Sequence, residues 1–519
     1  MDSPAVTQLF RQLFRHHPAC QSRRNLATLA AAIRDVRRQR LHGAQQPHLR
    51  QPQPSQQNRT YAIRGRGAAE DTKTSTESNW QQRSELFQHD MSTEYKTYPF
   101  VTADDLRSRK ERPRRVKMLM RDFIEDSLYN PNYGYFSKQV VIFTPGEPFD
   151  FPSLQDELDF HSLLSKRYVE FEDRLDEIEP SDTRQLWYTP TELFRPYYGE
   201  AIARYLIANY KLTTYPYHDL TIYEMGAGRG TLMLNILDYI RDIDPAVYDR
   251  TKYNIIEIST QLANLQTSQV MKNTAARGHS DKVEIINQSI FDWKQRVPSP
   301  CFFLAFEVFD NFAHDVVRYD MTTEVPMQGI VLIDEAGDFY EFYTPELDPV
   351  AARYFRVRDA ATGGRYKVPY PTSRVGKWLS QQRPLASNLS NQEYIPTRLM
   401  QFFDVLGRYF PAHRLLTSDF HSLPDAIKGL NAPIVQTRYQ RRPVPVSTPL
   451  VHQGYFDIMF PTNFETAEAV YKTITGKHSR VMSHDEFMQR WAYIEDTETR
   501  SGENPLLSWY KNASVLFTV

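Results

Sequence analysis

The chain has 519 residues, of which 41% are hydrophobic and 24% charged, and its formal net charge is −1. This length suits one large domain with insertions or two domains, and a net charge so close to zero excludes a global field that would attract nucleic acid. The sequence contains no apolar run long enough to cross a bilayer and no C-x-x-C or His/Cys cluster, so we predict neither a transmembrane segment nor a metal site.

The amino end is basic and poor in acids. Residues 1–67 contain twelve Arg and two Asp, without any Lys or Glu. This composition is typical of a mitochondrial transit peptide, and Arg59-Thr60-Tyr61-Ala62 looks like a matrix-protease site with cleavage after Tyr61. We therefore predict a transit peptide over residues 1–61, with a disordered basic tail as the alternative. Its removal would leave Cys301 as the one cysteine, which suits a reducing compartment.

Residues 62–112 are polar and predict a linker or an extended arm. From Pro113 the pattern changes, and the spacing of apolar residues predicts an amphipathic helix. This helix opens an amino-terminal, substrate-side helical region over residues 113–212. Its apolar positions are Val116, Leu119, Met120, Phe123, Ile124 and Leu128.

An acidic insertion over residues 137–188 interrupts this region. Between Gln155 and Asp182 it carries ten acidic and three basic residues, and apolar residues at helical spacing predict one acidic helix there. The helix could present a solvated face, or it could act as a lid or docking arm for a basic partner. A second helix is predicted to begin at Thr189-Pro190-Thr191-Glu192, where the carboxylate in the first turn favours the helix dipole.

The stretch from Leu220 to Ile240 is the most informative one. Residues 220–223 predict a short strand, Glu224 to Gly230 a glycine-rich turn, and the apolar residues after Thr231 a helix. Glycine permits positive φ and lets a ligand approach the backbone closely. The glycine spacing differs from the G-x-G-x-x-G of dinucleotide sites. A carboxylate at Glu224 would repel a pyrophosphate, so the turn favours a cationic ligand.

Three more strands with acidic ends follow this turn. The pairs are Tyr253–Ile258 with Glu257, residues 283–286 with Asp292, and Phe302–Phe306 with Glu307. Strands that alternate with helices, including one at Gln261–Met271, predict an α/β fold with a mostly parallel, doubly wound sheet. Ligands of such sheets bind beyond the carboxyl ends of the strands, so four carboxylates at successive ends indicate one shared site.

The rest of the chain is assigned more coarsely. Strands at Val316–Tyr319 and Ile330–Ile333 are predicted to be antiparallel, and residues 337–390 give no clear pattern. Further predicted elements are helices at Pro396–Leu406 and Phe487–Tyr493, and strands at Arg414–Phe420, Ile434–Arg438 and Tyr455–Phe460. We expect residues 213–480 to form the core with insertions, and residues 481–519 to form a carboxyl-terminal helix and tail.

Three motifs of this chain resemble those of the MidA-like family. They are Glu224–Leu232 (EMGAGRGTL), Ile256–Ser259 (IEIS) and Glu307–Asn311 (EVFDN). The resemblance implies a Rossmann-like class I methyltransferase fold with an additional substrate-side region and insertions, and S-adenosyl-L-methionine (SAM) as the cofactor. It also implies a SAM-dependent protein arginine methyltransferase of the mitochondrial matrix, which modifies a complex I subunit and supports complex I assembly.

The chain departs from the family pattern on the substrate side. Gln185-Leu186-Trp187-Tyr188 stands where the family has Gly-Asp-Phe before Thr-Ser-Pro-Glu, and Asp419-Phe420-His421 replaces an Asp-Tyr-Gly-type turn. These differences support a second interpretation, a diverged and catalytically weak or inactive assembly scaffold. A methyltransferase of small molecules is the third, although the long insertion and carboxyl-terminal half favour a protein substrate.

The motifs place the expected cofactor site residue by residue. The expected cofactor-binding residues are Glu224, Gly226, Gly228, Gly230, Glu257 and Asp292. The glycines would let the backbone approach the methionine part of SAM, and Glu224 would interact with its ammonium directly or through water. Glu257 suits the two ribose hydroxyls because a carboxylate accepts both hydrogen bonds. Asp292 is expected to accept a hydrogen bond from the adenine amino group.

The expected catalytic residues are carboxylates, because arginine is a poor nucleophile that stays protonated. A carboxylate beside the guanidinium can orient it, localise its charge and take up the released proton. Glu307 is the first candidate and Asp310 the second, with a structural hydrogen bond and a helix N-cap as their alternative roles. Glu192 could help align the substrate, with helix capping as its alternative. His314 is expected to be a surface or supporting residue rather than a base.

Overall fold

The computed structural model describes residues 80–82, 90–138, 140–257, 270–373, 388–424, 426 and 431–519. The predicted transit peptide over residues 1–61 and most of the helix predicted at 261–271 lie outside the described residues. Among the residues described, no helix is both long and apolar enough to span a membrane. The contacts reported below all belong to one compact unit over Ser75–Val519.

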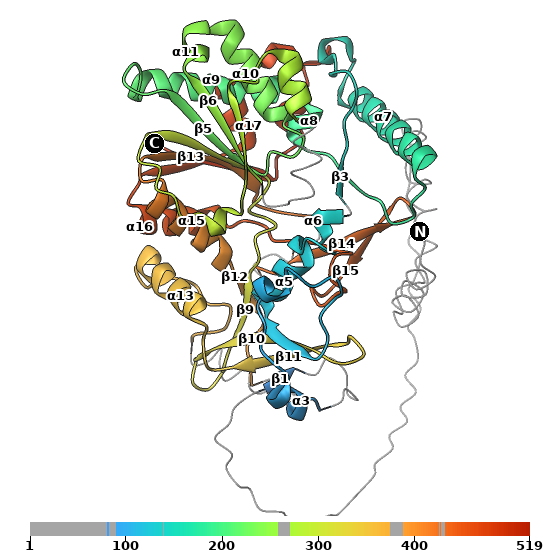
Figure 1. The fold of residues 1–519 in the computed structure, drawn as a ribbon, viewed down its shortest axis with the longest axis vertical. Coiled ribbons are helices and arrows are strands. Elements are labelled where there is room, and N and C mark those ends of the chain that lie inside the picture. Colours follow the sequence, from blue (N-terminus) through green and yellow to red (C-terminus); the bar gives the residue numbers. More distant parts are fainter. Residues whose placement is uncertain are drawn as a thin grey trace, which may run out of the picture. The chain divides into compact units, whose positions relative to one another are not determined.

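A seven-stranded sheet forms the centre of this unit (Figure 1). In order across the sheet, its strands are β17 (Ser479–Ser483), β18 (Ala513–Thr518), β13 (His413–Phe420), β8 (Cys301–Phe306), β5 (Leu220–Met225), β6 (Thr251–Glu257) and β7 (Val283–Asn287). The strands from β13 to β7 run parallel, and β18 pairs antiparallel with β13 and β17. The chain adds strands first on one side of β5 and then on the other, which confirms the doubly wound sheet.

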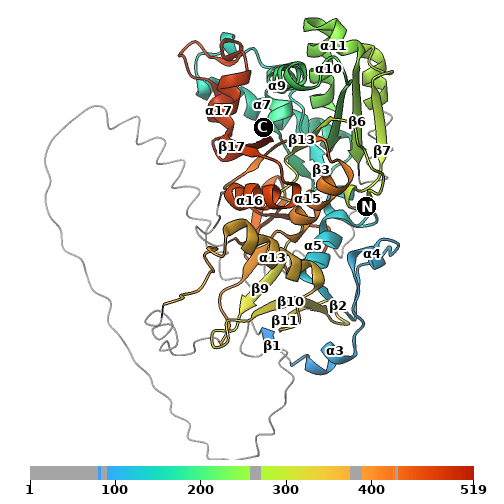
Figure 2. The same cartoon turned by 90° about the vertical axis from the view of Figure 1, so that its left-hand side faces the viewer.

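Helices cover both faces of this sheet (Figures 1 and 2). They are α9 (Tyr197–Thr213), α10 (Thr231–Ile243) and α17 (His484–Trp491) on one face, and α15 (Thr397–Tyr409) and α16 (Phe464–Thr475) on the other. Leu220 and Ile222 of β5 pack with the first group, whereas Tyr223 and Met225 pack with the second. A strand buried on both faces shows no regular alternation of polar and apolar residues, and in β5 only Thr221 and Glu224 are polar.

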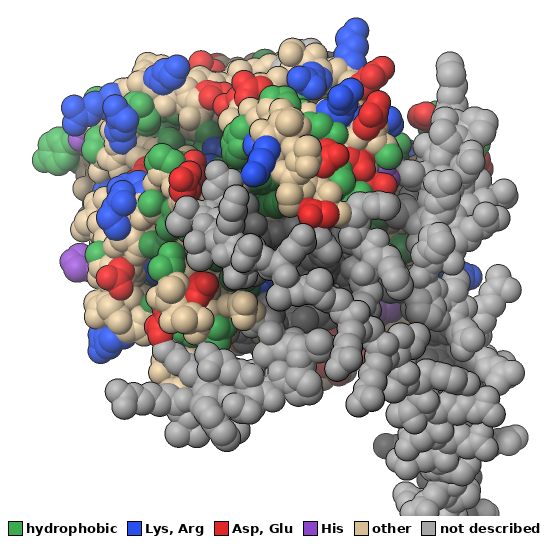
Figure 3. Space-filling view, turned by 90° about the horizontal axis from the view of Figure 1, so that it is seen from below, with side chains coloured by type: hydrophobic (Ala, Val, Ile, Leu, Met, Phe, Trp, Pro, Cys, Tyr) green, Lys and Arg blue, Asp and Glu red, His purple; other side chains and the backbone are tan. Residues whose placement is uncertain are grey.

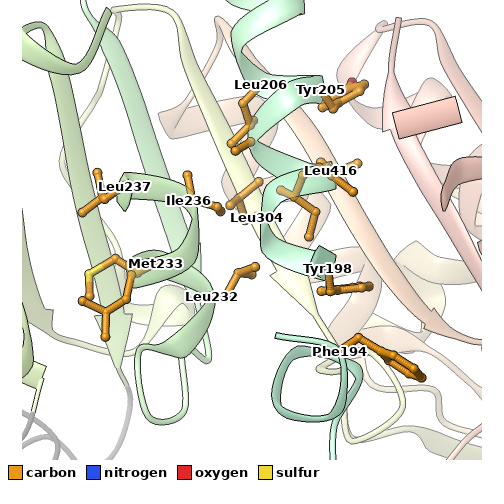
Figure 4. Packing of buried hydrophobic residues seen from close by; sticks show 14 of the residues in the cluster. Phe194, Tyr198, Tyr205, Leu206, Leu232, Met233, Ile236, Leu237, Leu304 and Leu416 are labelled. Carbon is orange, nitrogen blue, oxygen red and sulfur yellow. The ribbon is translucent and has the colours of Figure 1, made fainter. Parts of the chain in front are cut away.

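The core under α9 and α10 explains the helical spacing seen in the sequence. Leu232 and Ile236 of α10 and Leu206 of α9 form one cluster with Leu304 of β8 and Leu416 of β13 (Figure 4). All five side chains are buried. The predicted strand, turn and helix over residues 220–240 are therefore confirmed.

A second, antiparallel sheet surrounds β10 (Pro326–Ile333). Its other strands are β1 (Trp80–Gln82), β2 (Val116–Leu119), β9 (Asp315–Tyr319), β11 (Phe339–Thr344) and β12 (Glu393–Ile395). β10 pairs with β2, β9 and β11, and all these pairs are antiparallel. This confirms the antiparallel direction predicted for the strands at Val316–Tyr319 and Ile330–Ile333.

The helix predicted from Pro113 is wrong over its first turn. Residues Val116–Leu119 form β2 and pair with Ile330–Ile333, and helix α5 (Met120–Tyr129) begins only afterwards. Val116, Met118 and Leu119 are buried against the second sheet. A run of four residues fits a strand and a helix turn equally well, so pairing with β10 decides the outcome.

The helix predicted from Thr189 is divided in two. α8 (Pro190–Leu193) begins at Thr189, whose side-chain oxygen accepts a hydrogen bond from the N–H of Glu192, and α9 starts after Pro196. Proline has no N–H to donate and cannot continue a helix, which explains the break.

Shorter elements connect these parts. They are α3 (Ser92–Thr97), α4 (Ala103–Leu106), α6 (Tyr135–Lys138), α11 (Pro245–Asp249), α13 (Pro349–Thr362), α18 (Pro505–Ser508), η2 (Phe151–Ser153), η3 (Ile290–Asp292) and η4 (Ile494–Thr497). On the described part of the face in Figure 3, Lys and Arg side chains stand among Asp and Glu side chains, in keeping with a net charge of −1.

The acidic insertion contains the helix predicted there, α7 (Glu157–Ile178). Buried Glu172 accepts hydrogen bonds from both terminal nitrogens of Arg438, at 3.0 and 3.1 Å. Arg438 belongs to a small sheet of β14 (Ile434–Tyr439), β15 (Arg442–Val446) and β16 (Asp457–Met459). Nearer the surface, Arg441 pairs with Asp173 and Asp176. Part of the acidic run therefore binds arginines of the same chain.

Two short parallel strands flank α7 in the sequence. They are β3 (Val140–Ile142) and β4 (Gln185–Trp187). Gln185 donates from Nε2 to Thr437 Oγ1 at 3.0 Å and accepts from the N–H of Arg438 at 3.0 Å. The insertion is thus attached to β14 through both its helix and its second strand.

We expect Arg438→Met to lower the free energy of unfolding by about 3–5 kcal/mol, because it leaves the buried carboxylate of Glu172 without its cation. Urea unfolding followed by circular dichroism measures the change. Arg441→Met is the matched control: its side chain is 39% exposed, and an exposed ion pair contributes only about 0–1 kcal/mol. Equal losses in the two variants would contradict the assignment of Arg438 as the main attachment point.

Candidate functional site

The turn between β5 and α10 requires its three glycines. Gly226, Gly228 and Gly230 have φ values of +73°, +53° and +75°, which side chains other than glycine rarely adopt. Space is also short: a Cβ atom would lie 2.8 Å from Val308 at Gly226 and 3.1 Å from Ile142 at Gly228. The turn therefore brings bare backbone, followed by the first N–H groups of α10, to the carboxyl end of β5.

Glu224 precedes this turn and is buried. Its Oε2 accepts a hydrogen bond from the hydroxyl of Tyr253 on β6 at 2.7 Å. Burial raises the pKa of Glu224 to about 7, and the hydrogen bond from Tyr253 opposes this shift. Near neutral pH the group is poised between its two protonation states, and a nearby cation would favour the ionised one.

Glu224→Gln should change how stability depends on pH. Because the pKa of Glu224 rises from 4.5 to about 7 on folding, the folded protein holds a proton that the unfolded chain releases between these values. Wild-type stability should therefore fall, relative to the variant, as pH rises from about 4.5 to 7, by up to about 3 kcal/mol. Urea unfolding of the ligand-free protein at several pH values tests this.

Glu257 and Asp292 also lie where the sequence predicted carboxylates. Glu257 is the last residue of β6 and is buried, whereas Asp292 ends η3 beyond β7. Asp292 forms an ion pair with Arg107 at 3.1 Å, and both side chains are about half exposed, at 48% and 49%. The predicted cofactor carboxylates therefore share the carboxyl edge of the sheet but differ in their surroundings.

Glu307 follows β8 directly, in a strained conformation. Its φ is +53°, which is uncommon for a residue with a side chain, and its N–H donates to the carbonyl of Ser418 at 2.9 Å. Asp419 of β13 holds the next residues, because its Oδ2 accepts from the N–H groups of Val308 and Phe309 at 3.0 and 2.7 Å. Val308 reaches the glycine turn, so this loop and the turn are neighbours.

Asp310 lies in the same loop and is almost fully buried, with 4% of its surface exposed. Its Oδ1 has no hydrogen-bond partner among the residues that the structure describes. The next residue, Asn311, donates from Nδ2 to Asp457 Oδ1 at 2.9 Å. The structure thus brings the two predicted catalytic acids, Glu307 and Asp310, together with Asp419 and Asp457.

Burial raises the pKa values in the carboxylate cluster, which comprises Glu307, Asp310, Asp419 and Asp457. Burial raises the pKa of Glu307 well above its usual value, and nearby Asp419 adds to the shift. The pKa of Asp310 is raised by burial and by the other three carboxylates, while burial raises the pKa of Asp457 to about 7. A buried oxygen without a partner is costly, so the cluster suits a bound cation that donates several hydrogen bonds.

Tyr129 of α5 links the cluster to the end of β6. Its hydroxyl donates to the carbonyl of Asn311 at 3.2 Å. Burial raises the pKa of Tyr129 well above its usual value, and the carboxylates that add to the shift include Asp310 and Glu257. Tyr129 therefore lies close enough to Glu257, the predicted ribose partner, and to Asp310, a predicted catalytic acid, for both carboxylates to raise its pKa.

Glu192 and His314 lie in different surroundings from this cluster. Glu192 is buried, and its Oε1 accepts from the hydroxyl of Thr231, the first residue of α10, at 2.5 Å. His314 stacks on Phe460 with a ring distance of 3.8 Å, and Nδ1 lies 2.7 Å from the carbonyl of Phe312. Burial lowers the pKa of His314 to about 3, so the ring stays neutral, in agreement with a supporting role.

The sequence analysis did not predict Asp457 as a site residue, and it noted Asp419 only because the turn there differs from the family's turn. Asp419 lies near the carboxyl end of a parallel strand next to β8, so the rule that found Glu307 could also have found it. Asp457 begins β16 of the small third sheet, and nothing in the sequence connects that strand with Asn311. Its place in the cluster depends on tertiary packing alone.

A large cavity of about 1690 Å³ is lined in part by sequence neighbours of the cluster residues. Phe309, which precedes Asp310, and His421, which follows the Asp419 turn, both line it. The described residues contain no group of three or more His, Cys, Asp or Glu side chains arranged to hold a metal ion. None of the four cluster residues lines this cavity, and the cluster itself is chemically suited to hold a cationic side chain.

The chain is similar to several known proteins. Residues 201–483 match the protein family described as "Putative S-adenosyl-L-methionine-dependent methyltransferase". "Protein arginine methyltransferase NDUFAF7 homolog, mitochondrial" from Schizosaccharomyces pombe is 26% identical over 388 residues, which cover 73% of this chain and 80% of that protein. The protein of the same name from Saccharomyces cerevisiae is 20% identical over 442 residues, or 80% of this chain and 94% of that protein.

Solved structures are also similar. A crystal structure from Burkholderia thailandensis with S-adenosyl-homocysteine bound has a TM-score of 0.48 and 15% identity, and the match covers 78% of this chain and 88% of that chain. A native crystal structure from the same organism gives a TM-score of 0.49, also with 15% identity, and covers 78% and 87%.

Proposed function

Because this chain belongs to the family of SAM-dependent methyltransferases that its residues 201–483 match, we propose that it methylates an arginine side chain of a mitochondrial protein. The fold is that of a class I methyltransferase, and the cofactor is SAM, which supplies an activated methyl group. The protein's task is then to position a nucleophile and to manage its proton.

The glycine turn fits the cofactor. A Cβ atom at Gly226 or Gly228 would meet Val308 or Ile142, so only bare backbone fits in this turn, and a ligand can approach such backbone closely. A sulfonium and an ammonium are cationic, which agrees with the acidic side chains at the edge of the sheet. Glu257 would bind the ribose hydroxyls and Asp292 the adenine amino group, as the sequence predicted.

The observation that carries the arginine assignment is the unpartnered Oδ1 of Asp310 within the carboxylate cluster. A guanidinium has five N–H donors and a permanent positive charge, so it can satisfy several buried carboxylate oxygens at once. Its charge would also lower the raised pKa of Glu307 and restore the ionised form. Glu307 would then accept the proton that the guanidinium nitrogen loses when it forms its new bond to carbon.

The substrate and its location form the finer part of the proposal. The two curated relatives are named mitochondrial protein arginine methyltransferases, and the Arg-rich amino end of this chain suits import. We place the protein in the mitochondrial matrix, with an arginine of a complex I subunit as substrate, on the resemblance of its motifs to the MidA-like family. The wide cavity beside Phe309 would accommodate a protein segment rather than a small metabolite.

Transfer of labelled methyl groups tests this function. The purified protein is incubated with methyl-labelled SAM and separated complex I subunits, and labelled residues are identified by mass spectrometry. We expect label on arginine of one subunit, and labelling at least about 100-fold slower when Glu307→Gln replaces the wild type. Label on a solvent-extractable small molecule would contradict the protein substrate. Binding of SAM without any transfer would favour an inactive assembly scaffold.

A further inference from the structure

Two acids of the carboxylate cluster lie at the ends of neighbouring strands. β8 and β13 are parallel, and Phe306 lies opposite Ser418 in their register, so Glu307 and Asp419 follow at the same edge. The N–H of Glu307 donates to the carbonyl of Ser418 at 2.9 Å, which fixes the two strand ends to each other. Neighbouring buried carboxyl groups do not ionise together readily, so one of the two holds a proton.

Asp419 is the acid whose anion the backbone stabilises. Its Oδ2 accepts from the N–H groups of Val308 and Phe309 at 3.0 and 2.7 Å, and its Oδ1 accepts from the N–H of Phe420 at 2.8 Å. Burial raises the pKa of Asp419 to about 6, and these N–H donors limit the rise. Asp419 is therefore mostly ionised near neutral pH. With 1% of its surface exposed, it is closed to a substrate.

Glu307 has the opposite surroundings. The described residues donate no hydrogen bond to its side chain, and part of the residue remains exposed. Burial raises the pKa of Glu307 well above its usual value, and the charge of Asp419 adds to the shift. Near neutral pH the ligand-free protein therefore holds the charge on Asp419 and the proton on Glu307. Surroundings that separate two acids in this way give them different roles.

The other titratable groups that face Glu307 are neutral near pH 7. They are Tyr198 of α9, Tyr510 before β18 and Asp310 of the same loop. Burial raises the pKa of both tyrosines, and the charge of Glu307 adds to the shift. Burial and then Asp419 raise the pKa of Asp310 well above its usual value. Asp419 is thus the neighbour whose charge acts on Glu307.

A guanidinium bound at Glu307 would act in the opposite direction. A positive charge within a few ångströms lowers the pKa of a carboxyl group. Held by this cation alone, Glu307 would be a weak base, whereas a general base works best when its pKa lies near the working pH. The negative charge of Asp419 opposes the effect of the guanidinium, so Glu307 can stay basic while the substrate is bound.

We propose that Asp419 is a positioning residue of the methyl transfer: its bonds hold the loop that carries Glu307, and its charge keeps Glu307 able to accept the proton of the substrate nitrogen. This role rests on the proposed function and deepens it, since Asp419 itself never touches the substrate. The two parts of the role can be separated. In Asp419→Asn the amide oxygen can still accept from the loop, but the charge is gone.

The pH dependence of transfer tests the role of the charge. Single-turnover transfer of labelled methyl groups to separated complex I subunits is measured from about pH 5.5 to 9, where a base of shifted pKa titrates. In Asp419→Asn the acid limb of the rate profile should move to lower pH by about one pH unit or more, because Glu307 loses its negative neighbour. The plateau rate should fall by about 3- to 10-fold, because the base is weaker.

The titration of Glu307 can also be followed without any transfer. The ligand-free protein is labelled with carbon-13 at the glutamate carboxyl carbons, and the NMR signal that Glu307→Gln lacks belongs to Glu307. Its midpoint should fall by about one pH unit or more in Asp419→Asn. If this shift is found in a protein that transfers no methyl group, the proposed reaction is wrong while the action of Asp419 on Glu307 is confirmed.

Two further substitutions of Asp419 guard against a variant that does not fold. Asp419→Ser is a smaller neutral replacement and should lower the midpoint of Glu307 as Asp419→Asn does. Asp419→Glu keeps the charge and should leave the midpoint and the acid limb where the wild type has them. Glu224 and Asp457, whose pKa values burial raises to about 7, titrate in every variant, so only differences between variants count.

Asp334→Asn is the matched control. Asp334 also accepts from two backbone N–H groups, those of Gly337 and Asp338 at 2.8 and 2.9 Å, but in the turn between β10 and β11. Its replacement should change neither the midpoint of Glu307 nor the rate profile. A loss of rate in Asp419→Asn that is equal at every pH, with an unchanged midpoint, would overturn the proposal, because Asp419 would then only support the fold.

Discussion

Gly226→Val should weaken binding of S-adenosyl-homocysteine by at least about 100-fold, or about 2.7 kcal/mol. The φ of +73° at this position is unfavourable for Val, and the added Cβ would lie 2.8 Å from Val308. The turn must then move, together with the N–H groups that the cofactor approaches. Isothermal titration calorimetry measures the change directly.

Gly278→Val is the control for backbone strain in this experiment. Gly278 has a similar φ of +79°, but a Cβ there would meet nothing within 4 Å. The two variants therefore share the conformational cost of positive φ and differ in position and steric contact. Binding by Gly278→Val should match the wild type. Normal binding by Gly226→Val would remove the glycine turn from the cofactor site.

The second large effect is expected in the rate of transfer rather than in binding. Glu307→Gln should lower kcat by about 100- to 10,000-fold, the range that a positioned general base contributes. Glutamine keeps the size and hydrogen bonding of the side chain but cannot take up a proton. The cofactor should still bind within about twofold of the wild type. Single-turnover transfer of labelled methyl groups measures the rate.

Glu341→Gln provides the matched control for this substitution. Glu341 lies on β11 of the second sheet, and burial raises its pKa to about 7, so it is another shifted carboxylate remote from the turn. Its replacement should leave the transfer rate unchanged. Full activity in Glu307→Gln would show that another group, with Asp310 as the next candidate, receives the proton.

The parts of the fold that follow from local pattern could be predicted from the sequence. The strand at 220–225, the positive-φ glycines and the helix from Thr231 form one local unit, so their spacing alone indicates their conformation. The strand-end carboxylates follow from the same logic, since parallel strands end at one edge of the sheet. The positions of Glu224, Glu257 and Glu307 at this edge could therefore be predicted from the sequence alone.

Features that depend on distant partners could not be predicted. Val116 to Leu119 become a strand only because β10 has an edge that accepts them. The bond between Asn311 and Asp457 spans 146 residues, and no periodicity relates the two positions. Arg438, which binds Glu172, is also far away in the sequence. The sequence could therefore predict the acidic helix but not the residue that its buried carboxylate binds.

The position of β18 has a consequence for how the chain is made. Residues Ala513–Thr518 insert between β13 and β17, which precede them in the sequence. During synthesis or passage through a membrane, one edge of β13 therefore stays unpaired until residues 513–518 are available to pair with it. An exposed strand edge of this kind invites aggregation and recognition by chaperones. The central sheet should therefore be completed late, in one cooperative step. Chains that end before Ala513 should be degraded rather than accumulate.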